Sequence, residues 1–150
     1  MARILRLDTK VALVVFVLMD MLCVGMGMGV PIFCILFGFA VGWYIARRAV
    51  SASQDVQDAL TKVFVYAFVT SLITFVGMCI IWVPALWMLF NPSTDFAKLG
   101  IPLILYDPKL SFIGFEVLMV FISPFLQLLT TIFAAYLTLL HWSRKHRQAL

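Results

Sequence analysis

Long apolar runs alternate with short polar segments along this chain. The apolar runs cover residues 11–28, 31–46, 62–89 and 111–140. Polar and charged residues collect before the first run, between the second and third runs, and after the fourth. Because about 20 consecutive apolar residues in a helix cross the hydrocarbon core of a bilayer, each run predicts a transmembrane helix. The pattern therefore predicts an all-α membrane protein, a four-transmembrane-helix bundle that forms a single domain over residues 1–150.

The first two runs are separated only by a short stretch rich in glycine. If the 36 residues 11–46 formed one helix, it would be about 54 Å long, whereas the hydrocarbon core is about 30 Å thick. A break between Gly25 and Pro31 gives two helices of suitable length, and glycine and proline are the residues that turns require. The sequence therefore predicts a tight hairpin at Gly25–Pro31 on the outer side of the membrane. The second outer connection is predicted to be a loop over residues 91–110.

Basic residues are divided unevenly between the two sides of this topology. The inner segments carry nine of them: Arg3, Arg6, Lys10, Arg47, Arg48, Lys62, Arg144, Lys145 and Arg147. The outer loop carries only Lys98 and Lys109. Since cytoplasmic segments of membrane proteins are enriched in Lys and Arg, this division predicts that both termini are cytoplasmic. The expected location is the cytoplasmic (plasma) membrane.

The composition agrees with a membrane protein and excludes other classes. Hydrophobic residues make up 64% of the chain and charged residues 12%, whereas soluble domains have about 45–50% and about 25%. The net charge of +4 does not indicate a nucleic-acid partner, because the basic residues flank the apolar runs and form no continuous basic face. The expected partners are the lipid bilayer and either further copies of this chain, as a homo-oligomer, or other membrane subunits.

The second predicted helix carries small residues at steps of four. They are Cys34, Gly38, Gly42 and Ala46. Such a stripe lets two helix backbones approach closely, and close van der Waals contact drives helix association in lipid. The stripe is predicted to be a helix-packing face.

A single carboxylate, Asp20, lies in the middle of the first run. At 1.5 Å per residue it is about 13 Å from either end of that helix, near the bilayer midplane. A charged group there costs at least about 2.5–3.5 kcal/mol, and the interiors of the other three predicted helices contain no Lys or Arg. We therefore expect Asp20 to be protonated, hydrogen-bonded or bound to a cation. Its candidate partners are polar residues of the third and fourth helices: Thr70, Thr74, Ser123 and Gln127.

Two interpretations of Asp20 stay open. It is either a proton or cation site in a transport path, or a neutral group that links helices by hydrogen bonds. A second carboxylate, Glu116, lies about 8 Å from the outer end of the fourth helix, and contact with interfacial water is the simpler interpretation there. A transport path predicts a hydrated cavity that reaches Asp20, whereas a structural role predicts a dry contact.

Sulfur-containing residues gather near the predicted hairpin and form a weak candidate for a soft metal such as Cu(I). They are Cys23, Cys34, Met26 and Met28. Methionine is also an adaptable filler of apolar cores, and packing is the preferred interpretation. We therefore expect no metal and no cofactor.

The chain contains none of the common catalytic motifs: no Cys-x-x-Cys pair, no His-Glu-x-x-His, no Gly-x-Ser-x-Gly and no phosphate-binding loop. The leading hypothesis is a non-enzymatic polytopic membrane protein that acts as a helical-bundle subunit or self-associating unit. The alternative hypothesis is a small solute transporter, or a cation- or proton-coupled transporter or channel component.

Overall fold

The computed structural model of the chain describes residues 8–26, 32–52 and 56–147. Within these ranges the regular secondary structure is entirely helical, and this confirms the predicted all-α class. Three helices are long and apolar enough to cross a membrane: Ile32–Ala52, Gln57–Phe90 and Pro108–Arg144. The helix before them contains 18 residues, which corresponds to about 27 Å.

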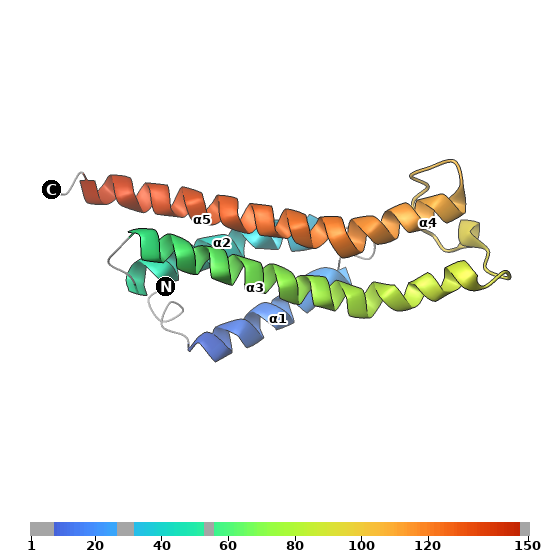
Figure 1. Ribbon diagram of the computed structural model, residues 1–150, viewed down its shortest axis with the longest axis horizontal. Helices are drawn as coiled ribbons and strands as arrows, with labels where there is room; N and C mark the ends of the chain where they lie inside the picture. The colour runs from blue at the N-terminus through green and yellow to red at the C-terminus, as the bar shows by residue number, and fades with distance from the viewer. Residues whose placement is uncertain (1–7, 27–31, 53–55, 148–150) are drawn as a thin grey trace.

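The helices form four rods, two of which change helix type along their length (Figure 1). The first two rods are α1 (Thr9–Met26) and α2 (Ile32–Ala52). The third is α3 (Val56–Trp82), followed by the 3₁₀ helix η2 (Val83–Phe90). The fourth runs from α4 (Pro108–Val117) through a π-helical turn, η4 (Leu118–Ile122), into α5 (Ser123–Arg147).

Several helices are longer than their apolar runs. The sequence predicts a second helix that ends at residue 46, but α2 continues to Ala52, and α3 begins at Val56 rather than at residue 62. The extensions carry polar side chains, but Ala49 and Ala59 within them are buried in the core, so packing between the helices continues beyond the apolar runs. Of the predicted hairpin Gly25–Pro31, Gly25 lies inside α1, and residues 27–31 fall outside the described ranges.

The loop that precedes α4 ends earlier than predicted, at Asp107 rather than at residue 110. The Asp107 side chain accepts hydrogen bonds from the backbone N–H groups of Lys109 at 2.7 Å and Leu110 at 3.2 Å. Pro108 occupies the first turn, where a missing N–H is tolerated. The short 3₁₀ helix η3 (Phe96–Lys98) lies within this loop.

Prolines mark the two irregular rods. Pro84 lies in the first turn of η2, where α3 gives way to 3₁₀ geometry. Pro124 follows the π-helical turn directly, and the Ser123 N–H donates to the carbonyl of Leu118, five residues earlier. Since proline has no N–H and its ring clashes with the preceding turn, a widened turn at this position accommodates it without interrupting the rod.

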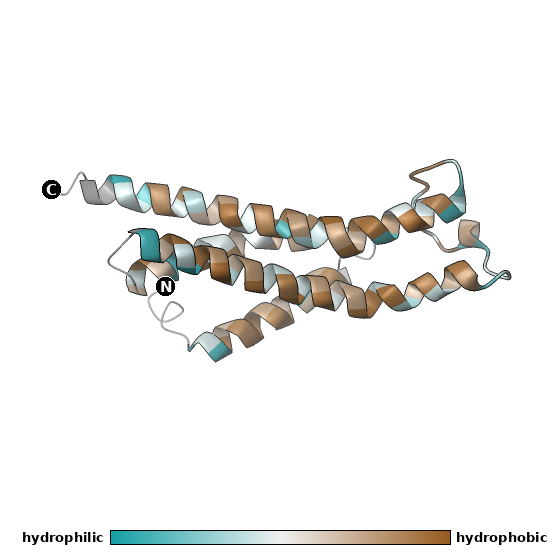
Figure 2. Ribbon diagram, in the orientation of Figure 1, coloured by the Kyte–Doolittle hydropathy of each residue, from teal (hydrophilic) through white to brown (hydrophobic). Residues whose placement is uncertain are grey.

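The ends of the four rods lie together at two opposite ends of the bundle (Figure 1). The first residues of α1 and the last of α5 lie at the same end of the bundle, where α2 ends and α3 begins (Figure 1). The opposite end holds η2, the start of α4 and the loop between them. Figure 2 shows hydrophobic residues over most of the rods, with the hydrophilic colour concentrated near the ends and at a few points along α5.

The closest pair of helices is α2 and α5, while α1 packs mainly against α2 and α3. Figure 1 shows that α1 diverges from its neighbours toward its first residues. One face of α3 is left exposed; its large side chains are Phe64, Phe68, Leu72, Val76 and Ile80. An apolar exposed face of this length is what a lipid-facing helix presents.

Candidate functional site

Asp20 lies at the junction of three rods. It is 2% exposed, although α1 packs less extensively against the bundle than α2, α3 and α5 do. Thr74 Oγ1 of α3 donates to Asp20 Oδ2 at 2.8 Å, and Gln127 Nε2 of α5 donates to Oδ1 at 3.1 Å. Both partners are themselves buried, so this three-residue group forms a closed polar contact between α1, α3 and α5.

The other two predicted partners of Asp20 are directed elsewhere. Thr70 Oγ1 donates to backbone carbonyls of its own helix, those of Tyr66 at 3.0 Å and Ala67 at 2.9 Å. Ser123 is fully buried, and its hydroxyl has no hydrogen-bond partner among the described residues. The structure therefore brings together Asp20, Thr74 and Gln127.

The Thr74 hydroxyl faces two acceptors. Besides Asp20 Oδ2, the carbonyl oxygen of Thr70 lies 3.2 Å from Thr74 Oγ1. A hydroxyl has a single hydrogen, so Thr74 satisfies only one of these acceptors if Asp20 is ionised. If Asp20 carries a proton on Oδ2, it donates to Thr74, and the Thr74 hydrogen remains available for Thr70. When the carboxyl group is neutral, Asp20 Oδ2, the Thr74 hydroxyl and the Thr70 carbonyl are therefore all hydrogen-bonded.

Glu116 lies apart from this group, on α4. The sequence favours contact with interfacial water, but Glu116 is only 4% exposed, and neither carboxyl oxygen has a partner among the residues that the structure describes. Aromatic residues cover this end of the rod. Trp82 lies edge-on against Phe115 with ring centroids 5.4 Å apart, and Phe96 of the loop contacts Phe112 at the same distance.

Unpaired buried acceptors recur along the same rod. Within the described ranges they are the Glu116 carboxyl oxygens, Ser123 Oγ and Gln127 Oε1. Ser123 and Gln127 are separated by four positions within α5, a spacing that places them on one face of the helix. The π-helical turn lies between Glu116 and Ser123.

The small-residue stripe of α2 lies against α5. A Cβ atom added at Gly42 would clash with the backbone carbonyl oxygen of Thr131, and one at Gly38 would clash with Thr130 Oγ1 and lie 2.8 Å from the carbonyl oxygen of Gln127. Thr130 Oγ1 also donates to the Ile35 carbonyl across the contact, at 2.8 Å. Cys34 and Ala46, the two ends of the stripe, are buried as well.

The sulfur-containing candidates are only partly placed. Cys23 and Cys34 are free thiols in one buried cluster with Met78, Met119 and Phe115. The side chain of Met26 and the whole of Met28 fall outside what the structure describes. The described ranges contain no group of three or more His, Cys, Asp or Glu residues able to hold a metal ion.

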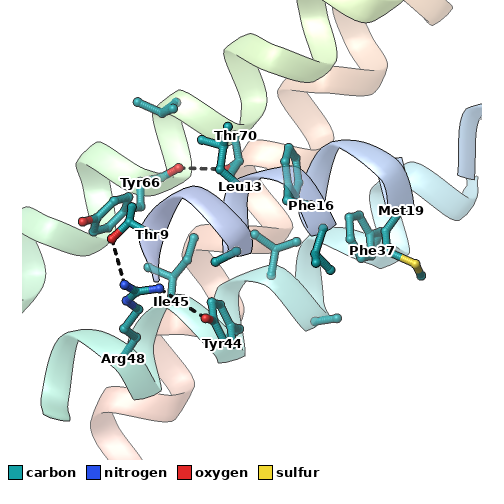
Figure 3. A pocket seen from close by; sticks show the side chains of 15 residues that line it. Thr9, Leu13, Phe16, Met19, Phe37, Tyr44, Ile45, Arg48, Tyr66 and Thr70 are labelled. Atoms are coloured by element: carbon teal, nitrogen blue, oxygen red, sulfur yellow. Dashed lines mark hydrogen bonds between the residues drawn. The ribbon is translucent and has the colours of Figure 1, made fainter. Parts of the chain in front are cut away.

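A cavity that sequence reasoning missed lies between α1, α2 and α3 (Figure 3). Its volume is about 240 Å³, and its walls are mainly apolar. We call it the lateral slot, and its polar side chains are Thr9, Tyr44, Arg48, Tyr66 and Thr70. Asp20 does not line it. The slot results from the divergence of α1, which no periodicity in the sequence indicates.

Comparison with known protein families, with curated proteins and with solved structures finds no match for this chain. Its function must therefore be inferred from its own residues and their arrangement.

Proposed function

We propose that this chain is a non-enzymatic integral membrane protein that acts as a helical-bundle subunit or as a self-associating unit. In this proposal four helices cross the plasma membrane, and both termini are cytoplasmic. The common position of the start of α1 and the end of α5 supports an even number of crossings (Figure 1). The excess of basic residues in the inner segments supports their cytoplasmic location.

The observation that carries the proposal is the closed contact of Asp20 with Thr74 and Gln127. A carboxylate that moves ions or protons needs access to water, whereas Asp20 is buried and absent from the walls of the lateral slot. None of the described Lys or Arg residues forms an ion pair with it. A neutral Asp20 that joins three helices fits these facts, since a charged group at this depth would be costly.

Mass determination after purification in mild detergent tests the proposal. A subunit or self-associating unit should elute as a complex heavier than the 16.9 kDa chain, and Asp20→Asn should assemble in the same way because asparagine keeps hydrogen-bonding groups at this position. A monomer in both detergent and lipid nanodiscs would contradict this function.

A second candidate, a proton- or cation-coupled transporter or channel component, is favoured by one specific observation. Glu116, Ser123 and Gln127 carry buried acceptors without partners among the described residues, and a π-helical turn interrupts the same rod. Such groups are costly unless water or an ion satisfies them, and π-helical turns often occur at functional sites.

This second candidate predicts proton or cation flux into proteoliposomes, measured with a pH-sensitive dye under defined ion gradients. Glu116→Gln should abolish the flux because the amide cannot be deprotonated, whereas Asp95→Asn, in the exposed loop, should leave it unchanged. Absence of flux in the unmodified protein would exclude the transport function under those gradients and leave the structural role.

A further inference from the structure

The lateral slot has a polar end and an apolar remainder. At the polar end Arg48 Nη2 donates to Thr9 Oγ1 at 2.8 Å, and Nη1 donates to the Tyr44 hydroxyl at 3.3 Å. Away from this end the walls are formed by side chains such as Phe16, Phe37 and Val41. Figure 3 shows Arg48 and Thr9 at one end and Phe37 and Met19 toward the other. The cavity is therefore amphipathic along its length.

The length of the slot matches one leaflet of a bilayer. Its wall on α1 extends from Thr9 to Met19, which corresponds to about 15 Å along the helix axis. A hydrocarbon core is about 30 Å thick, so one leaflet contributes about half of it. The stacked rings of Phe16 and Phe37, 5.7 Å apart, belong to the deeper part of the wall.

Arg48 is the only charged residue among those that line the slot. A guanidinium group has five N–H donors in a fork that suits phosphate, and the hydrogen bonds to Thr9 and Tyr44 use two of them. Beside it, Arg47 lies over the ring of Trp43 at 5.6 Å, an arrangement typical of the level of lipid headgroups.

We propose that the lateral slot holds an acyl chain of an anionic phospholipid, whose headgroup phosphate binds Arg48. An apolar wall one leaflet long fits a lipid chain, and the single cationic mouth selects a negative headgroup over a zwitterionic one. The cavity is too small for a helix of a partner protein, whose diameter with side chains is about 10–12 Å. This inference rests on the membrane placement proposed above.

Native mass spectrometry of the full chain tests the proposal. The protein is mixed in detergent with equimolar palmitoyl-oleoyl phosphatidylglycerol and phosphatidylcholine, and the retained lipids are counted. The unmodified chain should retain phosphatidylglycerol in about fivefold excess, the ratio expected for one Arg near a headgroup. Arg48→Gln should remove the excess, whereas the matched control Arg47→Gln, next in the chain but outside the slot, should keep it.

A second variant tests whether the slot holds the acyl chain of the lipid, without changing the charge of the protein. Ala40→Phe, in the wall of the slot, should reduce retention of both lipids severalfold, while Ile80→Phe on the exposed face of α3 should not. Thermal unfolding of each variant distinguishes loss of lipid binding from loss of the fold. If Arg48→Gln does not fold, Arg48→Lys, which keeps the positive charge, takes its place. Equal retention of the two lipids by the unmodified chain, or equal effects of Arg47→Gln and Arg48→Gln, would overturn the proposal.

Two further measurements distinguish failure of the lipid-binding proposal from failure of the proposed function. Excess glycerophosphoglycerol, the same headgroup without acyl chains, should not displace the bound lipid, and displacement would mean that the site binds a free phosphate instead. Asp20→Asn lies outside the slot and should keep the lipid preference. A bundle that fails to assemble as proposed, yet prefers phosphatidylglycerol, would refute the subunit function alone.

Discussion

Each carboxyl oxygen of Asp20 has one hydrogen-bond partner, and the two partners belong to different helices. Because the three groups are buried together, removing one leaves the others without compensation from water. Interhelical hydrogen bonds in membranes are worth about 0.6 kcal/mol on average, with a maximum of about 1.7 kcal/mol. An orphaned buried donor costs about 1–3 kcal/mol, so truncation should affect stability more than the bonds themselves contribute.

Asp20→Leu should therefore lower the free energy of unfolding by about 1–3 kcal/mol, because it leaves the Gln127 amide unpaired. The double variant Asp20→Leu/Gln127→Leu should be less destabilised than the sum of the two single changes, since both partners are then apolar. Unfolding of the four proteins in the same detergent gives the coupling. Strict additivity would mean that the contact with Gln127 contributes nothing.

Thr74 and Thr70 offer a matched pair one helical turn apart. Thr74→Val removes the hydroxyl that bonds to Asp20 Oδ2 and leaves this buried oxygen unpaired, so it should destabilise the protein by about 1–3 kcal/mol. Thr70→Val removes hydrogen bonds that the Thr70 hydroxyl makes only to carbonyls of its own helix, and should be nearly neutral. The comparison uses the same thermal unfolding assay, and a larger effect at Thr70 would contradict the observed geometry.

The sequence identifies Asp20 and four candidate partners, but only Thr74 and Gln127 contact it. Helical periodicity gives the face of each residue, yet it does not give the relative height and rotation of two helices. Ser123 lies on the same face as Gln127, one turn away, and does not meet the carboxyl group. Glu116 is buried as well, and no local pattern in the sequence predicts that.

At the scale of elements, the contact between α2 and α5 is the closest in the bundle, and it depends on two glycines. At Gly42 the obstacle to a side chain is a backbone carbonyl, which cannot move without shifting the whole of α5. At Gly77, by contrast, the nearest atom is Met21 Cε, at 3.1 Å, the end of a flexible side chain. A small residue is therefore required where the backbones of two helices approach each other closely, and not where a flexible side chain is the nearest neighbour.

Gly42→Ala should destabilise the protein by about 1–3 kcal/mol, the usual range for added bulk in a tightly packed interface. Gly114→Ala is the control, since an added Cβ there meets nothing within 4 Å and alanine is favoured over glycine in a helix by about 1 kcal/mol. Opposite signs for these two changes in the free energy of unfolding are the expected result. Destabilisation of similar size at both positions would point to helix propensity rather than to the interface.

The positions of the helices follow from the apolar runs, while their irregularities do not. Pro124 has no N–H and therefore removes one backbone hydrogen bond from the rod, but both a kink and a widened turn accommodate this loss. Here the widened turn forms, and Ser71 Oγ of α3 donates to the Pro124 carbonyl at 2.9 Å. The choice therefore depends on a neighbouring helix, whose position the local sequence does not give.

For the whole molecule, the sequence predicts the all-helical class and the long apolar helices, because a bilayer demands both. It does not predict the divergence of α1, which separates one helix from an otherwise parallel set and creates the lateral slot (Figure 1). The divergence follows from unequal packing: α2 and α5 meet through small residues, whereas α1 is in contact with bulky side chains such as Phe37.

Membrane topology gives the prediction for the whole molecule. Cysteines introduced at Gln57 and His141, near the end where α1 begins, should react with a membrane-impermeant maleimide only after the cells are opened. A cysteine at Thr94, in the loop at the other end, should react in intact cells. The unmodified chain serves as the blank for its three native cysteines, two of which are buried.

Labelling of Gln57→Cys and Thr94→Cys from the same side would contradict four crossings, because the rod from α3 through η2 separates these two positions along the length of the bundle. Labelling of all three positions in the reverse sense would keep the helices but invert the protein, and the basic residues would then face the outer side, against the distribution of charge that membrane insertion follows.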